Sequence, residues 1–188
     1  MPTAAEPTLE AKVQELWDIR AIESLLNRYS RAFDRCDLAG AQDTFWPDAL
    51  TDYPGFCGLA SGMCVHADTI HREQFDSTQH YITNNEIEIS GDAAHSETYF
   101  IMAARLKDAF DALLIGGRYL RRIERRDGVW RIASTVTVVD WSSDKNAARQ
   151  VIESGSKSAR DKSDFVYQRP LEITRTAVEQ EMALNRHA

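Results

Sequence analysis

The sequence predicts an α+β fold in which N-terminal helices pack on one face of a curved, mostly antiparallel sheet. Two observations predict it: apolar residues recur at helical spacing near the N-terminus, and four consecutive strand-like runs joined by short turns follow. A helix that closes a strongly curved sheet makes a cone, whose inside is a natural ligand pocket. The 188 residues suffice for one domain, which we place at residues 1–142, with residues 143–188 as a C-terminal tail.

The first predicted element is a long helix that begins at Leu9. Its second half carries one apolar stripe at the spacing of a helix face: Ile22, Leu25, Leu26, Tyr29 and Phe33. Asp34 ends this helix and lies nearer to Asn27 and Ser30 than to the stripe. The pattern alone therefore favours a solvated carboxylate there. A negative charge is unfavourable at a helix C-terminus, which is a small sign of another role.

Two shorter helices and one short strand are predicted next. Asp37 is a suitable N-cap for a helix over residues 37–45, and a third helix is predicted over residues 66–74. The stretch between them, residues 46–64, contains two prolines and three glycines. We therefore predict only a short strand over residues 50–53, followed by a loop.

Four long strands account for the second half of the predicted domain. They are expected at residues 78–90, 94–106, 112–126 and 129–142. Asp127-Gly128 between the last two is a strong hairpin signal. The tail is polar until a final predicted helix over residues 171–185, which has too few apolar residues for a core of its own. We expect it to pack across the sheet or on a neighbouring subunit.

Composition and charge limit the possible functions. The net charge of −7 disfavours binding to nucleic acid and to anionic membranes, although it is compatible with a local site for a small anion. The three cysteines, Cys36, Cys57 and Cys64, have no paired spacing, which indicates free thiols in a reducing compartment. The N-terminus lacks a signal-peptide pattern, and no apolar run is long enough to cross a bilayer. We therefore expect a cytoplasmic protein that acts on a small molecule.

His80 is the strongest single candidate for chemistry. Residues two apart on a strand share a face, so Ile82 and Asn84 are predicted to lie beside His80 and to line a mixed pocket. A hydrogen-bonded core or surface histidine would show the same pattern. If a carboxylate such as Asp34 holds the imidazole, the pair is a general base near neutral pH.

Three tyrosines lie where a pocket is expected. Tyr29 is on the first helix, Tyr53 on the first strand and Tyr119 on the third long strand. A tyrosine can donate a hydrogen bond to a developing oxyanion. Each of the three can equally be an amphipathic core residue.

The sequence contains no signature of a metal or cofactor site. His66 and His71 are five residues apart, which is the wrong spacing for a shared metal site on one helix face. No Gly-rich phosphate loop and no nucleophile elbow is found. Five arginines within residues 118–126 are accompanied by Glu124 and Asp127, which favours a charged outer face of the sheet.

The order of several segments resembles the SnoaL-like branch of the nuclear-transport-factor-2-like superfamily, which has a cystatin-like cone. The resemblance covers about residues 10–142. It rests on Ala21-Ile22-Glu23, Tyr29, Asp34, Thr51-Asp52-Tyr53, Thr78-Gln79-His80-Tyr81, Gly116-Gly117-Arg118-Tyr119 and Arg125-Arg126-Asp127-Gly128-Val129-Trp130-Arg131-Ile132. The hairpin segment identifies the fold but says little about function.

The resemblance implies a catalytic pair. Asp34 and His80 match the Asp–His dyad of scytalone dehydratase, hexachlorocyclohexane dehydrochlorinase and bile-acid 7α-dehydratase. Tyr29 and Tyr53 match pocket residues of these relatives. At the position of the dehydrochlorinase's pocket arginine this chain has Thr135.

Two further positions depart from scytalone dehydratase. Tyr119 stands where that enzyme has a pocket asparagine, and Ala103 or a neighbour stands where it has a second histidine. The implied base is thus retained while the contacts to the substrate and leaving group differ. A halide leaving group and scytalone itself are therefore not implied.

The resemblance implies a cofactor-independent lyase, above all a dehydratase, that acts on a hydrophobic cyclic or aromatic molecule. His80 and Asp34 would be catalytic, and Tyr29, Tyr53, Asn84, Tyr119 and Thr135 would bind the substrate. A carbon–carbon lyase for lignin-derived aromatic compounds, an isomerase with the same base, and a non-catalytic binding or accessory protein remain alternatives. Relatives form dimers or trimers, so a homo-oligomer is expected.

Overall fold

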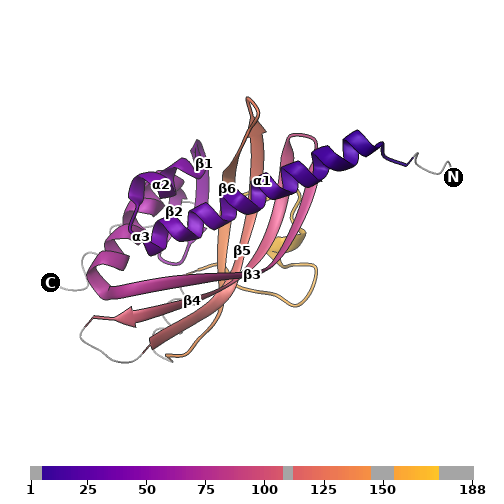
Figure 1. Ribbon diagram of the computed structural model, residues 1–188. Helices are drawn as coiled ribbons and strands as arrows, with labels where there is room; N and C mark the ends of the chain where they lie inside the picture. Colours follow the sequence, from indigo (N-terminus) through magenta and orange to yellow (C-terminus); the bar gives the residue numbers. More distant parts are fainter. Residues whose placement is uncertain (1–5, 108–111, 145–154, 174–188) are drawn as a thin grey trace.

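A computed structural model describes residues 6–107, 112–144 and 155–173. These ranges contain three α-helices, six strands and one short 3-10 helix (Figure 1). In chain order the elements are α1 Leu9–Asp34, α2 Leu38–Asp43, β1 Phe45–Tyr53, β2 Phe56–Leu59, α3 Ala60–Gln74, β3 Phe75–Ser90, β4 Ala93–Leu106, β5 Ala112–Arg126, β6 Val129–Ser142 and η1 Phe165–Tyr167. None of the helices in the described ranges is both long and apolar enough to span a membrane.

The six strands form one sheet in the order β2-β1-β6-β5-β4-β3. Neighbouring strands are antiparallel except β1 and β6, which are parallel. Figure 1 shows α1 lying across one face of the curved sheet, with α2 and α3 near the end of the sheet that β1 and β2 form. We call the face under α1 the inner face and the opposite one the outer face. The predicted α+β architecture is confirmed.

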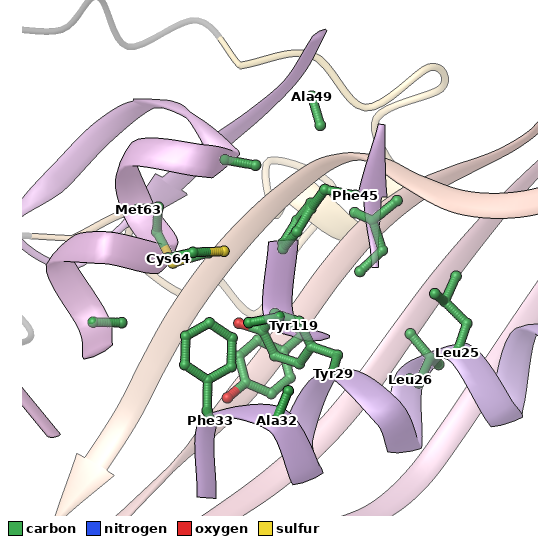
Figure 2. Close-up of a cluster of buried hydrophobic side chains, with 14 of the residues drawn as sticks. Leu25, Leu26, Tyr29, Ala32, Phe33, Phe45, Ala49, Met63, Cys64 and Tyr119 are labelled. Atoms are coloured by element: carbon green, nitrogen blue, oxygen red, sulfur yellow. The ribbon is translucent and has the colours of Figure 1, made fainter. Parts of the chain in front are cut away.

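The main core lies between the helices and the inner face (Figure 2). The predicted apolar stripe of α1 is buried, and its members are at most 6% exposed. Figure 2 shows Tyr29 and Phe33 of α1 grouped with Tyr119 of β5, next to Met63 and Cys64 of α3. Each fully buried large side chain contributes about 1.5–3 kcal/mol. Burial of the stripe therefore holds α1 on the sheet.

A polar contact fixes the N-terminal half of α1. The buried carboxylate of Asp18 accepts hydrogen bonds from Arg125 Nη1 at 3.0 Å and from the indole Nε1 of Trp130 at 2.9 Å. These partners flank the β5–β6 turn, where Asp127 and Gly128 have φ values of 51° and 78°. Two positive φ values are what a two-residue hairpin turn requires and what an Asp-Gly pair tolerates. The predicted hairpin is confirmed.

Residues 45–64 contain more regular structure than the sequence predicts. β1 begins at Phe45, β2 occupies part of the predicted loop, and α3 begins at Ala60 rather than at residue 66. Gly62 disfavours a helix on propensity alone, but packing requires a small residue there. A Cβ at this position would lie 3.0 Å from the ring of Phe56. Tertiary packing therefore overrides the propensity signal.

The described part of the tail packs on the outer face of the sheet. Leu171 forms a second apolar cluster with Leu120 of β5 and with Val136 and Val138 of β6. Residues 171–173 are not helical. The rest of the predicted terminal helix, from residue 174 onward, lies outside the described residues.

Candidate functional site

Asp34 and His80, which are 46 residues apart in the chain, meet where α1 ends beside β3. Nδ1 of His80 lies 2.6 Å from Oδ1 of Asp34, and the backbone N–H of His80 donates to Oδ2 at 2.9 Å. The hydroxyl of Thr78 donates to Oδ1 at 3.0 Å. The side chains of Asp34 and His80 are 11% and 7% exposed. We call Asp34 and His80 the dyad.

The local structure explains why Asp34 is not solvated, as its helix position alone favours. Asp34 is the last residue of α1 and follows Ser30 by four positions, so both lie on the same side of the helix. Ser30 is buried, and Asp34 is held by β3. Thr78 and His80 are two residues apart on β3 and point to the same face. β3 therefore covers Asp34 on a side of α1 that lies outside the apolar stripe.

The hydrogen bonds set the ionisation of Asp34. Burial alone would raise the pKa of this carboxyl group, but the hydrogen bonds from the His80 ring, the His80 backbone and Thr78 outweigh burial and hold the pKa below its usual value of 3.8. Asp34 is therefore a carboxylate at neutral pH and accepts the proton on Nδ1 of His80. The lone pair of the neutral ring is then on Nε2, which is the arrangement of a general base.

His71 of α3 belongs to the site, although its spacing from His66 in the sequence indicates only that the two do not share a metal site. Its ring is parallel to that of His80 within 8°, with centroids 6.0 Å apart, and its Nδ1 lies 3.4 Å from the Thr78 hydroxyl. Burial and the nearby His80 lower the pKa of His71. A neutral His71 avoids two positive charges when His80 accepts a proton. The missed signal was helical spacing, since His71 follows the buried Ala67 by four residues.

Aromatic rings lead away from the dyad along the inner face. The His80 ring lies 6.5 Å from Phe100, which stacks on Tyr119 at 4.3 Å, and Tyr119 lies 5.6 Å from Tyr29. Burial raises the pKa of both Tyr29 and Tyr119. Both hydroxyl groups therefore keep their protons and act as neutral donors.

Arg121 lies inside the fold, so the prediction that residues 118–126 form a charged outer face is wrong for this residue. It is 1% exposed, and its guanidinium carbon lies 4.5 Å from the ring centroid of Tyr29 and 4.2 Å from that of Tyr119. Its three guanidinium nitrogens make no hydrogen bond of good geometry within the described part of the chain, although the nearby Tyr29 raises the pKa of Arg121 against the effect of burial. Strand alternation could have found it, because residue 121 shares a face with the pocket candidate Tyr119.

The environment of Arg121 is energetically unfavourable. Burial lowers its pKa, but a guanidinium remains charged at neutral pH. Removing a charge from water without a counter-ion costs several kcal/mol, and a desolvated cation–π contact contributes only about 2 kcal/mol. The contacts with Tyr29 and Tyr119 therefore offset only part of the cost.

Two more predicted substrate-binding residues lie on the inner side. Tyr53 of β1 is half-buried, packs against the core and has its ring 6.5 Å from that of His66. Thr135 of β6 is 1% exposed and pairs in register with Arg121 of β5. The position that matches the pocket arginine of the dehydrochlorinase is thus a threonine, with an arginine beside it on the next strand.

The prediction that Asn84 shares the inner face with His80 is wrong. The β3–β4 register shifts between Ile82 and Asn85, and this irregularity reverses the alternation. Asn84 is exposed, whereas Oδ1 of Asn85 accepts a hydrogen bond from the buried Thr98 hydroxyl at 2.8 Å. Asn85 occupies the inner place that was expected for Asn84.

Other features of the described residues do not compete with the dyad as a reactive centre. No group of three or more His, Cys, Asp or Glu side chains in these ranges is arranged to hold a metal ion. Three surface hollows of about 460, 580 and 580 Å³ are lined by residues other than Asp34 and His80. The hollow of about 460 Å³ is rich in carboxylates, including Glu86, Glu88 and Glu97. Arg121, Ser96 and His95 also line it. His95 lies opposite Glu88 across β3 and β4, but the carboxylate of Glu88 pairs with Arg169 instead.

Comparison with solved structures supports the fold. A scytalone dehydratase-like protein from Novosphingobium aromaticivorans superposes with a TM-score of 0.65 at 20% identity, over 71% of this chain and 91% of that one. A hexachlorocyclohexane dehydrochlorinase, LinA type 2, gives 0.64 at 23% identity, over 70% and 91%. A nuclear transport factor 2-like superfamily protein from Salmonella enterica gives 0.59 at 18% identity, over 67% and 93%.

Sequence comparison identifies the family directly. No curated protein matches the chain. The family model of the SnoaL-like domain matches residues 14–136, which is more than half of the chain and includes Asp34, His80 and Arg121. The cone-shaped α+β structure agrees with that match. The chain therefore belongs to the SnoaL-like domain family, with the fold of the nuclear-transport-factor-2-like superfamily.

Proposed function

We propose that this protein is a cofactor-independent lyase, a dehydratase, that acts on a hydrophobic cyclic or aromatic small molecule. One observation carries the proposal: the 2.6 Å contact between His80 Nδ1 and Asp34, with Nε2 left as the basic atom. The structural likeness to a scytalone dehydratase-like protein and to a dehydrochlorinase supports a lyase reaction. Dehydration and dehydrochlorination are both eliminations, in which a base removes a proton from carbon and a neighbouring group leaves.

In the proposed reaction His80 acts first as a base and then as an acid. Nε2 takes a proton from the carbon next to a substrate carbonyl, and the electron pair of that C–H bond forms a C=C bond. The adjacent C–O bond breaks, and the departing hydroxyl takes the proton from Nε2, so water leaves and His80 returns to its neutral form. Asp34 stays ionised and stabilises the imidazolium between the two steps.

Neutral tyrosines are suited to the negative charge that develops on the substrate. As the proton leaves, the carbonyl oxygen becomes enolate-like, and O–H donors stabilise it. Tyr29 and Tyr119 are proposed as these donors, since both are buried, protonated and on the inner face with Phe100. Tyr53 is proposed as a further contact, because it packs against the same core and is close enough to raise the pKa of both Tyr29 and Tyr119.

The test is turnover by matched variants on cyclic and aromatic β-hydroxy carbonyl compounds. His80→Asn and Asp34→Asn should each lower turnover by about 10²–10⁴-fold, which is the usual contribution of a positioned acid or base. His95→Asn is the control, because His95 is a half-buried histidine on β4 that is not part of the dyad. Circular dichroism should show that all three variants fold. Turnover near the wild-type level in the His80 variant contradicts the mechanism.

Product analysis separates dehydration from the alternatives. Mass spectrometry distinguishes loss of water from loss of a carbonyl fragment and from no change of mass. Exchange of the substrate's carbon-bound proton in D₂O reports the base directly, even where no group leaves. A wild-type protein that binds these compounds but neither exchanges nor converts them is a binding protein, and the lyase proposal fails.

A further inference from the structure

Arg121 is the centre of a polar row that crosses the inner face. β1 pairs Thr51 with Thr135, β6 pairs Thr135 with Arg121, and β4 pairs Ser96 with Arg121. Side chains opposite each other in a sheet share a face, so these residues form one line. We call Thr51, Thr135, Arg121 and Ser96 the inner polar row.

Every side chain of the inner polar row is buried without a partner. All four residues are at most 5% exposed. The three hydroxyl oxygens and the guanidinium nitrogens make no hydrogen bond within the described ranges. Buried polar groups in folded proteins are normally satisfied, so four neighbours in one row that depart from this rule indicate a place built for something outside the chain.

The charge of Arg121 indicates what binds there. A planar guanidinium presents paired N–H donors that match a carboxylate in a bidentate geometry, and hydroxyls beside it can donate to the same oxygens. The neighbours Tyr29, Tyr119 and Phe100 offer ring surfaces rather than further charges. The surroundings therefore suit an anionic group attached to an apolar body.

The row also lies in line with the dyad. The Arg121 guanidinium lies over Tyr119, which precedes it by two residues on β5. The side chain of Arg121 therefore extends along the sheet toward the dyad. His80 pairs with Met102, four residues along β4 from Thr98, the partner of Tyr119. Four strand residues span about 13 Å, and the Phe100 ring lies within that interval. The separation along the inner face from the Arg121 guanidinium to His80 is therefore about the length of a molecule with one or two rings.

We propose that Arg121, with the hydroxyls of Thr51 and Thr135, binds the carboxylate of a hydrophobic acid whose ring lies along Tyr119 and Phe100. This inference names the substrate class of the proposed lyase and rests on that function for the reaction at His80. The binding step itself is measured without turnover. Arg121 and Ser96 also line the hollow of about 460 Å³ that holds Glu86, Glu88 and Glu97. We therefore place the carboxylate at the guanidinium and the two threonine hydroxyls, on the side of Arg121 where Tyr29 and Tyr119 lie.

Calorimetric titration with two probes of the same shape tests the proposal. Benzoate carries the carboxylate, and benzamide is its neutral counterpart. The variants are Arg121→Met, Arg121→Lys and, as matched control, Arg122→Met. Arg122 is the next residue of β5, points to the opposite face and pairs with Glu124.

The expected result is a charge preference that depends on Arg121. Wild type and Arg122→Met should bind benzoate about 10- to 100-fold more tightly than benzamide, as a hydrogen-bonded charged pair allows. Arg121→Met should remove the preference. Arg121→Lys should keep only part of it, because an ammonium lacks the paired donors. If the Met variant does not fold, the Lys variant and the wild-type preference still decide the outcome.

Three results would overturn the proposal. Equal affinity of wild type for benzoate and benzamide excludes recognition of the charge. Undiminished binding of benzoate by both Arg121 variants excludes this residue. Inorganic phosphate that binds as tightly as benzoate and competes with it identifies a simple anion site instead.

A last comparison keeps the two proposals separate. His80→Asn should still bind benzoate as wild type does, because the dyad does not hold the carboxylate. If benzoate binding depends on Arg121 but no substrate proton exchanges, the carboxylate site at Arg121 is supported and the lyase proposal fails. If the protein dehydrates neutral compounds and benzoate binding does not depend on Arg121, the lyase proposal is supported and the carboxylate site at Arg121 is excluded.

Discussion

Arg118 and Arg121 are two buried arginines on one strand, three residues apart, and their surroundings are opposite. On the outer face Arg118 pairs with Glu97 at 2.8 Å, with Asp164 at 3.0 Å and with Asp140 at 3.3 Å. On the inner face the guanidinium of Arg121 meets aromatic rings and no hydrogen-bond partner in the described part of the chain. Because an odd spacing on a strand reverses the face, the same residue type enters two different environments.

The comparison shows how an arginine that stabilises the fold differs from an arginine that is available to bind a ligand. Three carboxylates around Arg118 include Asp164, the N-cap of η1, so this cluster ties the C-terminal segment to the sheet. These hydrogen bonds raise the pKa of Arg118 even though burial opposes the charge. Burial dominates at Arg121 and lowers its pKa. The outer arginine stabilises the fold, whereas the inner one costs stability and is available for binding.

The largest expected effect contrasts the two arginines directly. Arg118→Met should lower the free energy of unfolding by about 3–5 kcal/mol, because it leaves the buried carboxylate of Asp164 without its partner, together with the partly exposed Glu97 and Asp140. Arg121→Met should leave it unchanged or raise it, since an apolar side chain replaces an unpaired buried charge. Urea denaturation of both variants measures the contrast. A loss for Arg121→Met as large as that for Arg118→Met would show that Arg121 is structural.

A smaller effect is expected at the inner carboxylate of the dyad. Asp34→Asn should lower the free energy of unfolding at pH 7 by about 1.5–3 kcal/mol, the usual contribution of hydrogen bonds to a charged group. Because folding lowers the pKa of Asp34 below 3.8, this contribution is complete above that value and is lost as pH falls through the folded-state pKa. The deficit of the variant should therefore shrink toward pH 2.

Denaturation at pH 7, 5, 3 and 2 provides the measurement for Asp34. Asp43→Asn serves as the control, because Asp43 is 65% exposed and pairs with Arg131 at the surface. A change within about 0.5 kcal/mol is expected for it. A deficit of Asp34→Asn that stays constant down to pH 2 would mean that the carboxylate is not held in its ionised form.

The smallest effect concerns which asparagine reaches the inner face. Asn85→Ala should cost about 1 kcal/mol or slightly more, since it leaves the buried Thr98 hydroxyl without its partner. Asn84→Ala should stay within about 0.5 kcal/mol, because Asn84 is exposed. Thermal unfolding of the pair measures the difference. Equal losses, or a larger loss for Asn84, would contradict the bulge in β3.

Regular periodicity made most of the fold predictable. The stripe of α1, the Asp-Gly hairpin and the four long strands all follow repeats that backbone geometry imposes. Arg121 could have been placed inside by the same rule, once Tyr119 was assigned to a pocket. It was missed because charge clustering was given more weight than alternation.

The predictions from sequence were wrong where contacts with distant residues override local helix and strand patterns. The bulge in β3 places Asn85 rather than Asn84 on the inner face. The sequence does not reveal this shift, because the two adjacent residues are both asparagines. The early start of α3 depends on Phe56 packing over Gly62. The pairing of Asp34 with His80 links positions 46 residues apart and was reached through family resemblance rather than through helix geometry. Residue patterns alone favoured a solvated carboxylate.

Two of the carboxylates of α1, Asp18 and Asp34, fix the length of the helix between them. Asp18 binds Arg125 and Trp130 beside one hairpin, and Asp34 binds His80 on β3. Asp34 follows Asp18 by 16 residues, which span about 24 Å of helix. Inserting or deleting one residue in this interval would turn Asp34 by about 100° relative to Asp18, so both ends could not bind at once. Lineages that keep both contacts can therefore exchange the exposed side chains of α1, but they can change the length of the helix only outside residues 18–34.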